Sequence, residues 1–183
     1  MPYQHTSLKL LRAIYLPRSI NARKYDYGNL LLIGGNFMYT GAPTLAALAA
    51  LRAGVDVLTL AAPSRAANAA AAIAPLITYP LGGDFLCKKH LSELIKLTDK
   101  KDAIVIGPGL GREEETLEVV RAIVASVEIP VVVDADGIYA FSRIKKLESR
   151  IKNRIIFTPH IREFEALSHQ KVIKDDIESK IQL

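Results

Sequence analysis

Two glycine-rich segments could bring the protein backbone close to a ligand. Residues 34–43 and residues 106–112 each place several glycines between a short apolar run and a helical pattern. Glycine allows positive φ and close approach, and the free N–H groups at the start of a following helix can bind an anion. Arg112 adds a cation to the second segment. Neither has the spacing of a G-x-G-x-x-G or Walker A loop. A structural turn therefore explains the first segment at least as well, whereas ligand or phosphate contact is favoured for the second.

Acidic and imidazole side chains follow two later apolar runs. Asp134 and Asp136 come directly after Val131–Val133 and could bind Mg²⁺ or hold a substrate hydroxyl, although Asp136 could instead cap a helix. His160 follows Pro159 near an expected helix start. Its imidazole could bind a substrate, move a proton or have only a structural role.

Alternating apolar runs and helical patterns predict an α/β layered domain. Short runs rich in Val, Ile and Leu, without in/out alternation, predict strands buried on both faces of a parallel sheet. These runs are Leu30–Ile33, Val55–Leu60, Ala103–Ile106, Val131–Val133 and Ile155–Phe157, with Ile77–Tyr79 as a weaker one. Helices are predicted at Thr44–Ala53, Ser64–Ala74, His90–Leu97 and Glu113–Val127. Because ligands bind at the carboxyl ends of parallel strands, we expect the four segments at one edge of the sheet.

Composition and charge exclude several other classes of protein. The chain has 183 residues, half of them hydrophobic, and a net charge of +5 that is concentrated at its two ends. There is no basic run with interleaved aromatic residues and no zinc-finger pattern, so no nucleic-acid binding is predicted. The uncharged run Leu30–Leu51 is interrupted by glycines and Pro43, which argues against a membrane span.

The single cysteine, Cys87, excludes an internal disulfide and fits a reducing compartment. No signal-peptide pattern is visible at the N-terminus, so a cytoplasmic location is predicted. Cys87 and His90 have C-x-x-H spacing, but no second pair completes a zinc site. No zinc site is therefore predicted, and no residue is assigned as a metal ligand.

The chain is predicted to be one domain, residues 1–183, with three parts. Residues 1–28 form an N-terminal extension, residues 29–168 a motif-bearing core, and residues 169–183 a charged tail that could be an amphipathic helix. A doubly wound sheet would usually continue from such a helix into another strand. We therefore expect that the C-terminal part of the fold is missing from this sequence.

Taken together, in this order and spacing, the motifs resemble the ATP/ADP-dependent NAD(P)H-hydrate dehydratases. The resemblance covers roughly residues 17–168. It is carried by Ile33-Gly34-Gly35, Tyr39–Pro43, Ala46–Gly54, Gly107–Arg112, Val133–Asp136 and Thr158–His160 with Glu163. It implies a ribokinase-like fold with a mainly parallel sheet flanked by helices. It also implies that ATP or ADP, with Mg²⁺, phosphorylates the hydroxyl of hydrated NADH or NADPH, after which phosphate leaves and the nicotinamide double bond is restored.

The resemblance also implies a set of substrate-binding residues. The contacts fall on Ala42, Gly109 and His160, with Gly41, Gly107, Asp134 and Asp136 in the same set. The family's nucleotide-holding Lys-Gly motif and its Gly-Thr-Gly-Asp segment with the catalytic Asp do not occur in these 183 residues, so no catalytic residue is assigned. Tyr139 also departs from the family, which usually has Asn there.

Three hypotheses follow. The first is the substrate half of a hydrate dehydratase, with negligible activity as an isolated chain. The second is a kinase on the same fold that acts on a small sugar or vitamin alcohol. The third is an inactive binding or assembly subunit whose exposed sheet edge needs a partner. A homo-oligomer is expected, since the alanine-rich helices could pack against a second copy.

Overall fold

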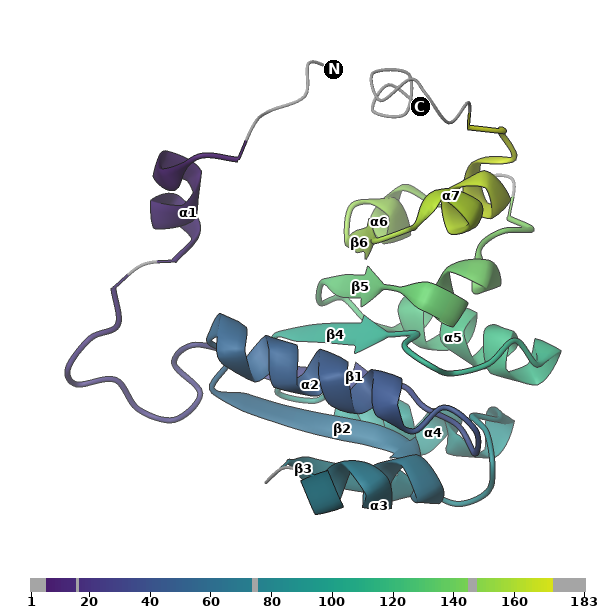
Figure 1. Cartoon of the computed structure of the whole chain (residues 1–183), viewed down its shortest axis with the longest axis horizontal. Coiled ribbons are helices and arrows are strands. Elements are labelled where there is room, and N and C mark those ends of the chain that lie inside the picture. The colour runs from purple at the N-terminus through teal and green to yellow at the C-terminus, as the bar shows by residue number, and fades with distance from the viewer. Residues whose placement is uncertain (1–5, 16, 74–75, 145–147, 173–183) are drawn as a thin grey trace.

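The computed structural model describes residues 6–15, 17–73, 76–144 and 148–172. Its centre is one sheet of six parallel strands in the order β3-β2-β1-β4-β5-β6 (Figure 1). The strands are β1 (Asn29–Ile33), β2 (Val57–Pro63), β3 (Ile77–Leu81), β4 (Ala103–Ile106), β5 (Val131–Val133) and β6 (Ile155–Phe157). The register aligns Ile33 with Ile106, Ile106 with Val133, and Val133 with Phe157. Four strands therefore end together at one edge of the sheet.

Helices cover both faces of this sheet. The helices that do so are among α2 (Gly41–Ala53), α3 (Ser64–Ile73), α4 (Leu91–Leu97), α5 (Glu114–Ser126), α6 (Ser149–Lys152) and α7 (Ile161–Ser168), whereas α1 (Leu8–Ile14) lies apart from the sheet (Figure 1). Two short 3-10 helices, η1 (Lys88–His90) and η2 (Ala135–Ala140), lie between strands and helices. The α/β layered fold predicted from the sequence is confirmed, and Ala103–Ile106, Val131–Val133 and Ile155–Phe157 are strands with the predicted bounds.

Alternation along the central strand divides the core in two. Leu30 and Leu32 pack with α2 and α3 on one face, whereas Leu31 and Ile33 pack with α4 and α5 on the other. The first face is rich in alanine, and Ala66, Ala67 and Ala70 of α3 are fully buried there. These small side chains let α2 and α3 lie close to the sheet, so the alanine-rich sequence of these two helices serves their packing.

Some element boundaries differ from the sequence prediction. Helix α2 begins at Gly41 rather than Thr44. Strand β2 runs from Val57 to Pro63 rather than from Val55 to Leu60, and it includes the small residues Ala61 and Ala62, which are buried like the larger ones. Ser64 is the first residue of α3, and its hydroxyl donates to the Leu81 carbonyl instead of capping the helix. The predicted helix in the charged tail falls mostly in residues 173–183, which lie outside the described residues.

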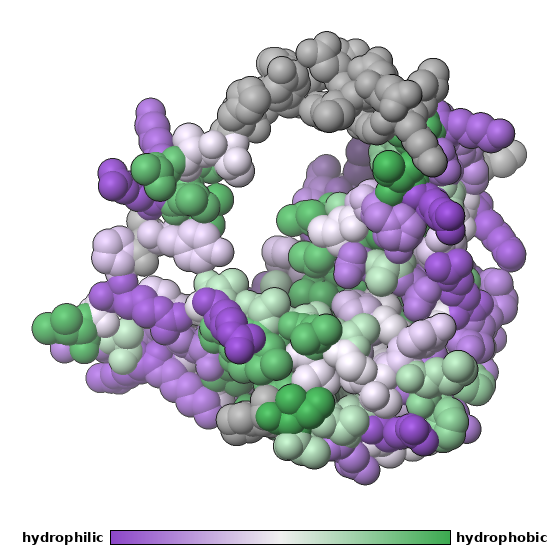
Figure 2. Space-filling model, viewed as in Figure 1, coloured by the Kyte–Doolittle hydropathy of each residue, from purple (hydrophilic) through white to green (hydrophobic). Residues whose placement is uncertain are grey.

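Helix α1 stands apart from the sheet (Figure 1). None of its residues is buried, and its leucines and Ile14 form an apolar surface on the helix (Figure 2). Within the described part of the chain, no helix is both long enough and apolar enough to cross a bilayer.

Replacing Leu31 with alanine tests the two-faced core. Leu31 is fully buried in the middle of β1, so Leu31→Ala should lower the free energy of unfolding by about 2–5 kcal/mol in a urea titration. Leu45 of α2 is 69% exposed, and Leu45→Ala should change it by only about 0.5 kcal/mol. Equal losses in the two variants would contradict this description of the core.

Candidate substrate-binding site

A cleft of about 390 Å³ opens at the edge where the strands end. Its walls come from the loops after β1, β4 and β5. They consist of Asn36, Met38, Tyr39, Gly109, Gly111, Arg112, Glu113 and Asp136. The volume is in the range of small-molecule binding sites in proteins. The structure therefore brings the first three predicted segments to one place.

Gly107 holds two of these loops together. A Cβ on Gly107 would lie 1.7 Å from the carbonyl oxygen of Asp134, and the residue has φ of +133°. The Asp134 amide also donates to the Ile106 carbonyl over 3.0 Å. Only glycine fits this position, so the loop after β4 rests directly on the backbone that follows β5.

Gly109 brings the second loop against the start of α2. It has φ of +70°, and a Cβ there would lie 3.0 Å from the Tyr39 Cβ and 3.3 Å from the Ala42 Cβ. Gly41, the first residue of α2, has open space where its Cβ would be. Ala42 and Gly109, two predicted substrate contacts, are thus neighbours, beside a helix start whose N–H groups favour an anion.

Asp136 connects η2 to the loop after β4. Its Oδ2 accepts from the Gly111 amide over 3.1 Å, and its Oδ1 accepts from the Arg112 Nε over 2.9 Å. The alternative in which Asp136 caps a helix is wrong, because Asp134 occupies the N-cap position of η2 and no side-chain hydrogen bond caps this helix. The reason is geometric, since the Gly107 contact brings the Gly111 amide within reach of Asp136.

The cation of Arg112 is well supported. Partial burial opposes the charge, but the hydrogen bond that Arg112 donates to Asp136 and the nearby negative charges outweigh it and raise the pKa of Arg112. Glu163 of α7 is one of those charges. The guanidinium also lies over the Tyr139 ring, with Cζ 3.6 Å from the ring centre. Arg112 is therefore a fixed positive charge in the cleft wall.

Asp134 and His160 each make defined contacts in the described structure. The Asp134 carboxylate accepts from the Thr158 hydroxyl over 2.7 Å, which ties the loop after β5 to the loop after β6. The His160 Nδ1 accepts from the Arg162 amide and so caps α7, while Nε2 lies 3.0 Å from a Glu163 carboxylate oxygen. His160 is not among the described residues that line the cleft, but its imidazole is 59% exposed and accessible to a ligand.

The sequence model of the NAD(P)H-hydrate dehydratase family matches residues 30–182. The chain belongs to this family. Among its relatives, the bifunctional NAD(P)H-hydrate repair enzyme Nnr of Pyrobaculum aerophilum is 43% identical over 154 residues, covering 82% of this chain and 30% of the relative. The ATP-dependent (S)-NAD(P)H-hydrate dehydratase of Entamoeba histolytica is 33% identical over 161 residues, covering 86% of this chain and 52% of the relative. The chain thus spans about a third to a half of these two proteins.

Solved structures agree with this assignment. The ADP/ATP-dependent NAD(P)H-hydrate dehydratase of Bacillus subtilis, co-crystallised with ATP and Mg²⁺, aligns with a TM-score of 0.71 and 25% identity, covering 89% of this chain and 55% of that one. A ribokinase-like protein of Enterococcus faecalis aligns with a TM-score of 0.81 at 23% identity, covering 97% and 61%. The family and the ribokinase-like fold predicted from the sequence are therefore confirmed.

Asn36 is a cleft residue that the sequence analysis did not single out. Its side chain is buried, and its carbonyl oxygen accepts from the amides of Met38 and Tyr39 over 2.8 and 2.7 Å. Its Nδ2 donates to the Leu110 carbonyl over 3.3 Å, across the cleft floor. An Asn directly after two glycines at a strand end was the available signal, because Asn side chains often bond the backbone of their own turn.

Cys87 and His90 form a structural contact. The buried His90 accepts from the Cys87 amide through Nδ1, over 3.2 Å, and its Nε2 is 2.8 Å from the Gly82 carbonyl. Both imidazole nitrogens are thereby used. Among the described residues, no group of three or more His, Cys, Asp or Glu could hold a metal ion.

The contact at Gly107 can be tested with two Gly→Ala variants. In Gly107→Ala, the added methyl collides with the Asp134 backbone, so the free energy of unfolding should fall by more than about 2 kcal/mol. In Gly41→Ala, the methyl enters open space at a helix start, and stability should stay the same or rise by up to about 1 kcal/mol. A Gly107→Ala protein as stable as the unmodified chain would refute the close packing of the two loops.

Proposed function

We propose that this chain binds hydrated NADH or NADPH in the cleft, as the substrate-binding part of an NAD(P)H-hydrate dehydratase. The observation that carries this proposal is the meeting of Ala42 and Gly109 beside the N-terminus of α2. Family membership supports the choice of substrate, since relatives from Pyrobaculum aerophilum and Entamoeba histolytica are named as enzymes that act on hydrated NAD(P)H.

The proposed substrate-binding set keeps the residues implied by the resemblance. Gly41, Ala42 and Gly109 would let the backbone lie against the substrate. Gly107 would keep the loop after β4 packed against the Asp134 backbone. Asp136 would orient the Gly109–Arg112 loop, Asp134 would fix the loop after β6, and His160 would approach the substrate from the start of α7. The contacts described above support each of these positions.

We further propose that the complete reaction uses ATP or ADP with Mg²⁺. The Bacillus subtilis protein is named as ADP/ATP-dependent and was co-crystallised with ATP and Mg²⁺, and the Entamoeba histolytica protein is named as ATP-dependent. Phosphorylation would turn the hydroxyl of the hydrated nicotinamide into a better leaving group. The described residues contain no candidate metal cluster, and the sequence contains no Walker A loop. No residue of this chain is therefore assigned to the metal or to phosphoryl transfer.

The proposal is tested by titrating the 183-residue chain with hydrated NADH in a calorimeter. We expect saturable binding, with no heat from ribose or another small alcohol, because only the dinucleotide offers nicotinamide, phosphates and ribose together. We also expect no rise in NADH absorbance when ATP, ADP and Mg²⁺ are added to the isolated chain. Binding of a small alcohol in preference to hydrated NADH would favour a kinase of sugars or vitamins instead.

A rise in NADH absorbance would contradict part of this proposal. If NADH absorbance rises with the isolated chain, the groups for phosphoryl transfer lie within these residues, and the chain is a whole catalyst rather than a substrate-binding part. If the chain binds hydrated NADH tightly and a version fused to a relative's C-terminal segment is also inactive, the role of an inactive binding subunit is favoured.

We also propose that the chain forms a homo-oligomer in the cytoplasm, with α1 docking on a second copy. No residue of helix α1 is buried, and Leu8 and Ile14 are 71% and 64% exposed. Its cations Lys9 and Arg12 suit the central part of a partner copy, since residues 29–142 contain more acidic than basic side chains. The single cysteine supports a reducing compartment such as the cytoplasm.

A double substitution on α1 tests this oligomer. Leu8→Lys with Ile14→Lys places charges on the docking surface, so light scattering after size-exclusion chromatography should give the monomer mass, while the unmodified chain gives a multiple of it. Ile73→Lys, at an equally exposed isoleucine of α3, should leave the mass of the oligomer unchanged. An unmodified chain that is monomeric at all concentrations refutes the proposal.

A further inference from the structure

The Tyr139 ring has a cationic partner in the structure. The Arg112 guanidinium lies over the ring, with Cζ 3.6 Å from the ring centre, while Arg112 Nε donates to Asp136 over 2.9 Å. Asp136 thus occupies one edge of the guanidinium, and the Tyr139 ring covers one of its faces. The side chain remains 55% exposed, and Arg112 lines the cleft.

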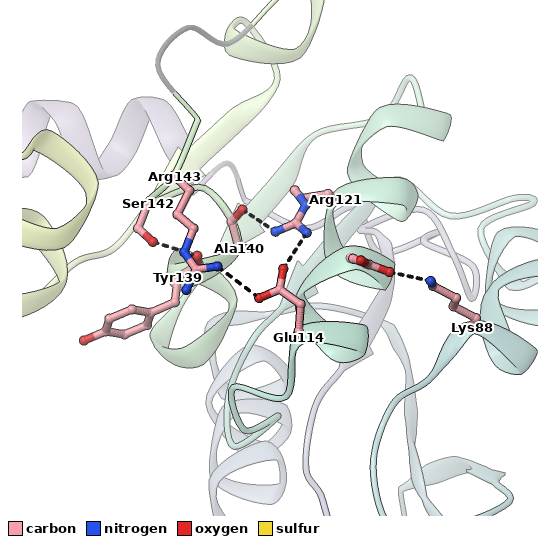
Figure 3. Close-up of polar contacts among 8 residues, drawn as sticks. Lys88, Glu114, Arg121, Tyr139, Ala140, Ser142 and Arg143 are labelled. Carbon is pink, nitrogen blue, oxygen red and sulfur yellow. Dashed lines mark hydrogen bonds and ion pairs between the residues drawn. The ribbon is translucent and has the colours of Figure 1, made fainter.

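The segment that carries Tyr139 is itself well anchored. Arg121 of α5 donates to the Ala140 carbonyl over 3.0 Å and pairs with Glu114 over 3.2 Å (Figure 3). The Ser142 hydroxyl donates to the Tyr139 carbonyl over 2.9 Å. The Tyr139 ring points away from these ion pairs in Figure 3 and is free to contact Arg112. Arg112 therefore rests on a fixed ring and loses little conformational freedom when it binds a ligand.

The remaining edge of Arg112 is available for a ligand. Within the described part of the chain, neither Nη atom has a hydrogen-bond partner. Two parallel N–H donors of this kind match two oxygens of a phosphate group. The raised pKa of Arg112 keeps the donor charged at any physiological pH.

The charges around Arg112 restrict the class of ligand. Asp136 is committed to Arg112 and to the Gly111 amide, while the neighbouring Glu113 is exposed and lines the cleft. The exposed Glu113 carboxylate would repel the charge of any phosphate, whether free or linked to ribose. A ribose phosphate suits the site better, because its hydroxyls can donate to Glu113 while its phosphate oxygens accept from Arg112.

We propose that Arg112 binds a ribose-linked phosphate of the ligand in the cleft and that Tyr139 is the residue that positions it. The proposal rests on the proposed function, because it identifies which residue contacts the phosphate of the hydrated dinucleotide. Tyr139 acts only through Arg112. The Tyr139 ring thus provides the flat surface on which the guanidinium is held.

The test compares dissociation constants for hydrated NADH, measured by calorimetry at several salt concentrations. Arg112→Gln should weaken binding about 10- to 100-fold, because a charge-assisted bidentate contact is lost. The slope of log Kd against log salt concentration should also become shallower, since one ion contact is gone. Arg143→Gln is the matched control: Arg143 is 83% exposed, pairs with Glu114 and does not line the cleft, so affinity should not change.

Variants of Tyr139 separate positioning from general stability. Tyr139→Phe keeps the ring and should retain affinity, whereas Tyr139→Leu removes the ring and should weaken binding several-fold, with the salt slope preserved because Arg112 is still charged. Urea titrations report the stability of each variant. If Arg112→Gln fails to fold, the comparison of Tyr139→Phe with Tyr139→Leu decides, and equal affinities in that pair overturn the proposal.

Two further results would be decisive and are distinguishable. If hydrated NADH binds the unmodified chain and Arg112→Gln binds it as well as Arg143→Gln does, Arg112 is not the phosphate contact, while the proposed function stands. If the unmodified chain binds no hydrated NADH, the proposed function fails, and this proposal fails with it.

Discussion

The packing of the Gly107 backbone against the Asp134 carbonyl fixes the geometry of the whole carboxyl edge. The register of the sheet aligns the ends of β4 and β5, but register alone would not hold their loops together. With no side chain at Gly107, the two loops touch, so Asp136 can reach the Gly111 amide and Arg112. The cleft, its cation and its glycine backbone all depend on this single contact.

The inner strands of the sheet were predictable because they are largely buried on both faces, whereas the edge strands β3 and β6 are partly exposed. Such strands have continuous Val, Ile and Leu runs, and Ala103–Ile106 and Val131–Val133 could be delimited from sequence for that reason. The limits of β2 were harder to predict, since the buried Ala61, Ala62 and Pro63 have no strong strand preference by themselves. Their burial comes from the helices packed above them, which is a tertiary effect.

The candidate site was predictable only as far as its backbone. Glycines at strand ends indicate close approach, and Gly107 and Gly109 lie where that argument placed them. The pairing of Arg112 with Tyr139 was not predictable, because it joins residues from two loops whose contact depends on the fold. Asp136 was assigned an alternative role as a cap for the same reason: its partners on the neighbouring loop could not be seen from local spacing.

The alanine-rich face of the sheet also fixes the position of a loop that lines the cleft. A Cβ on Gly35 would lie 2.7 Å from the Ala66 Cβ, so the loop after β1 rests on α3 with no space between them. Any larger side chain at Ala66 would lift that loop, together with Asn36 and the residues that follow it. The small side chain of Ala66 in α3 therefore determines the distance between α3 and the loop after β1. For this reason, α3 limits how far the shape of the cleft can change as the sequence diverges.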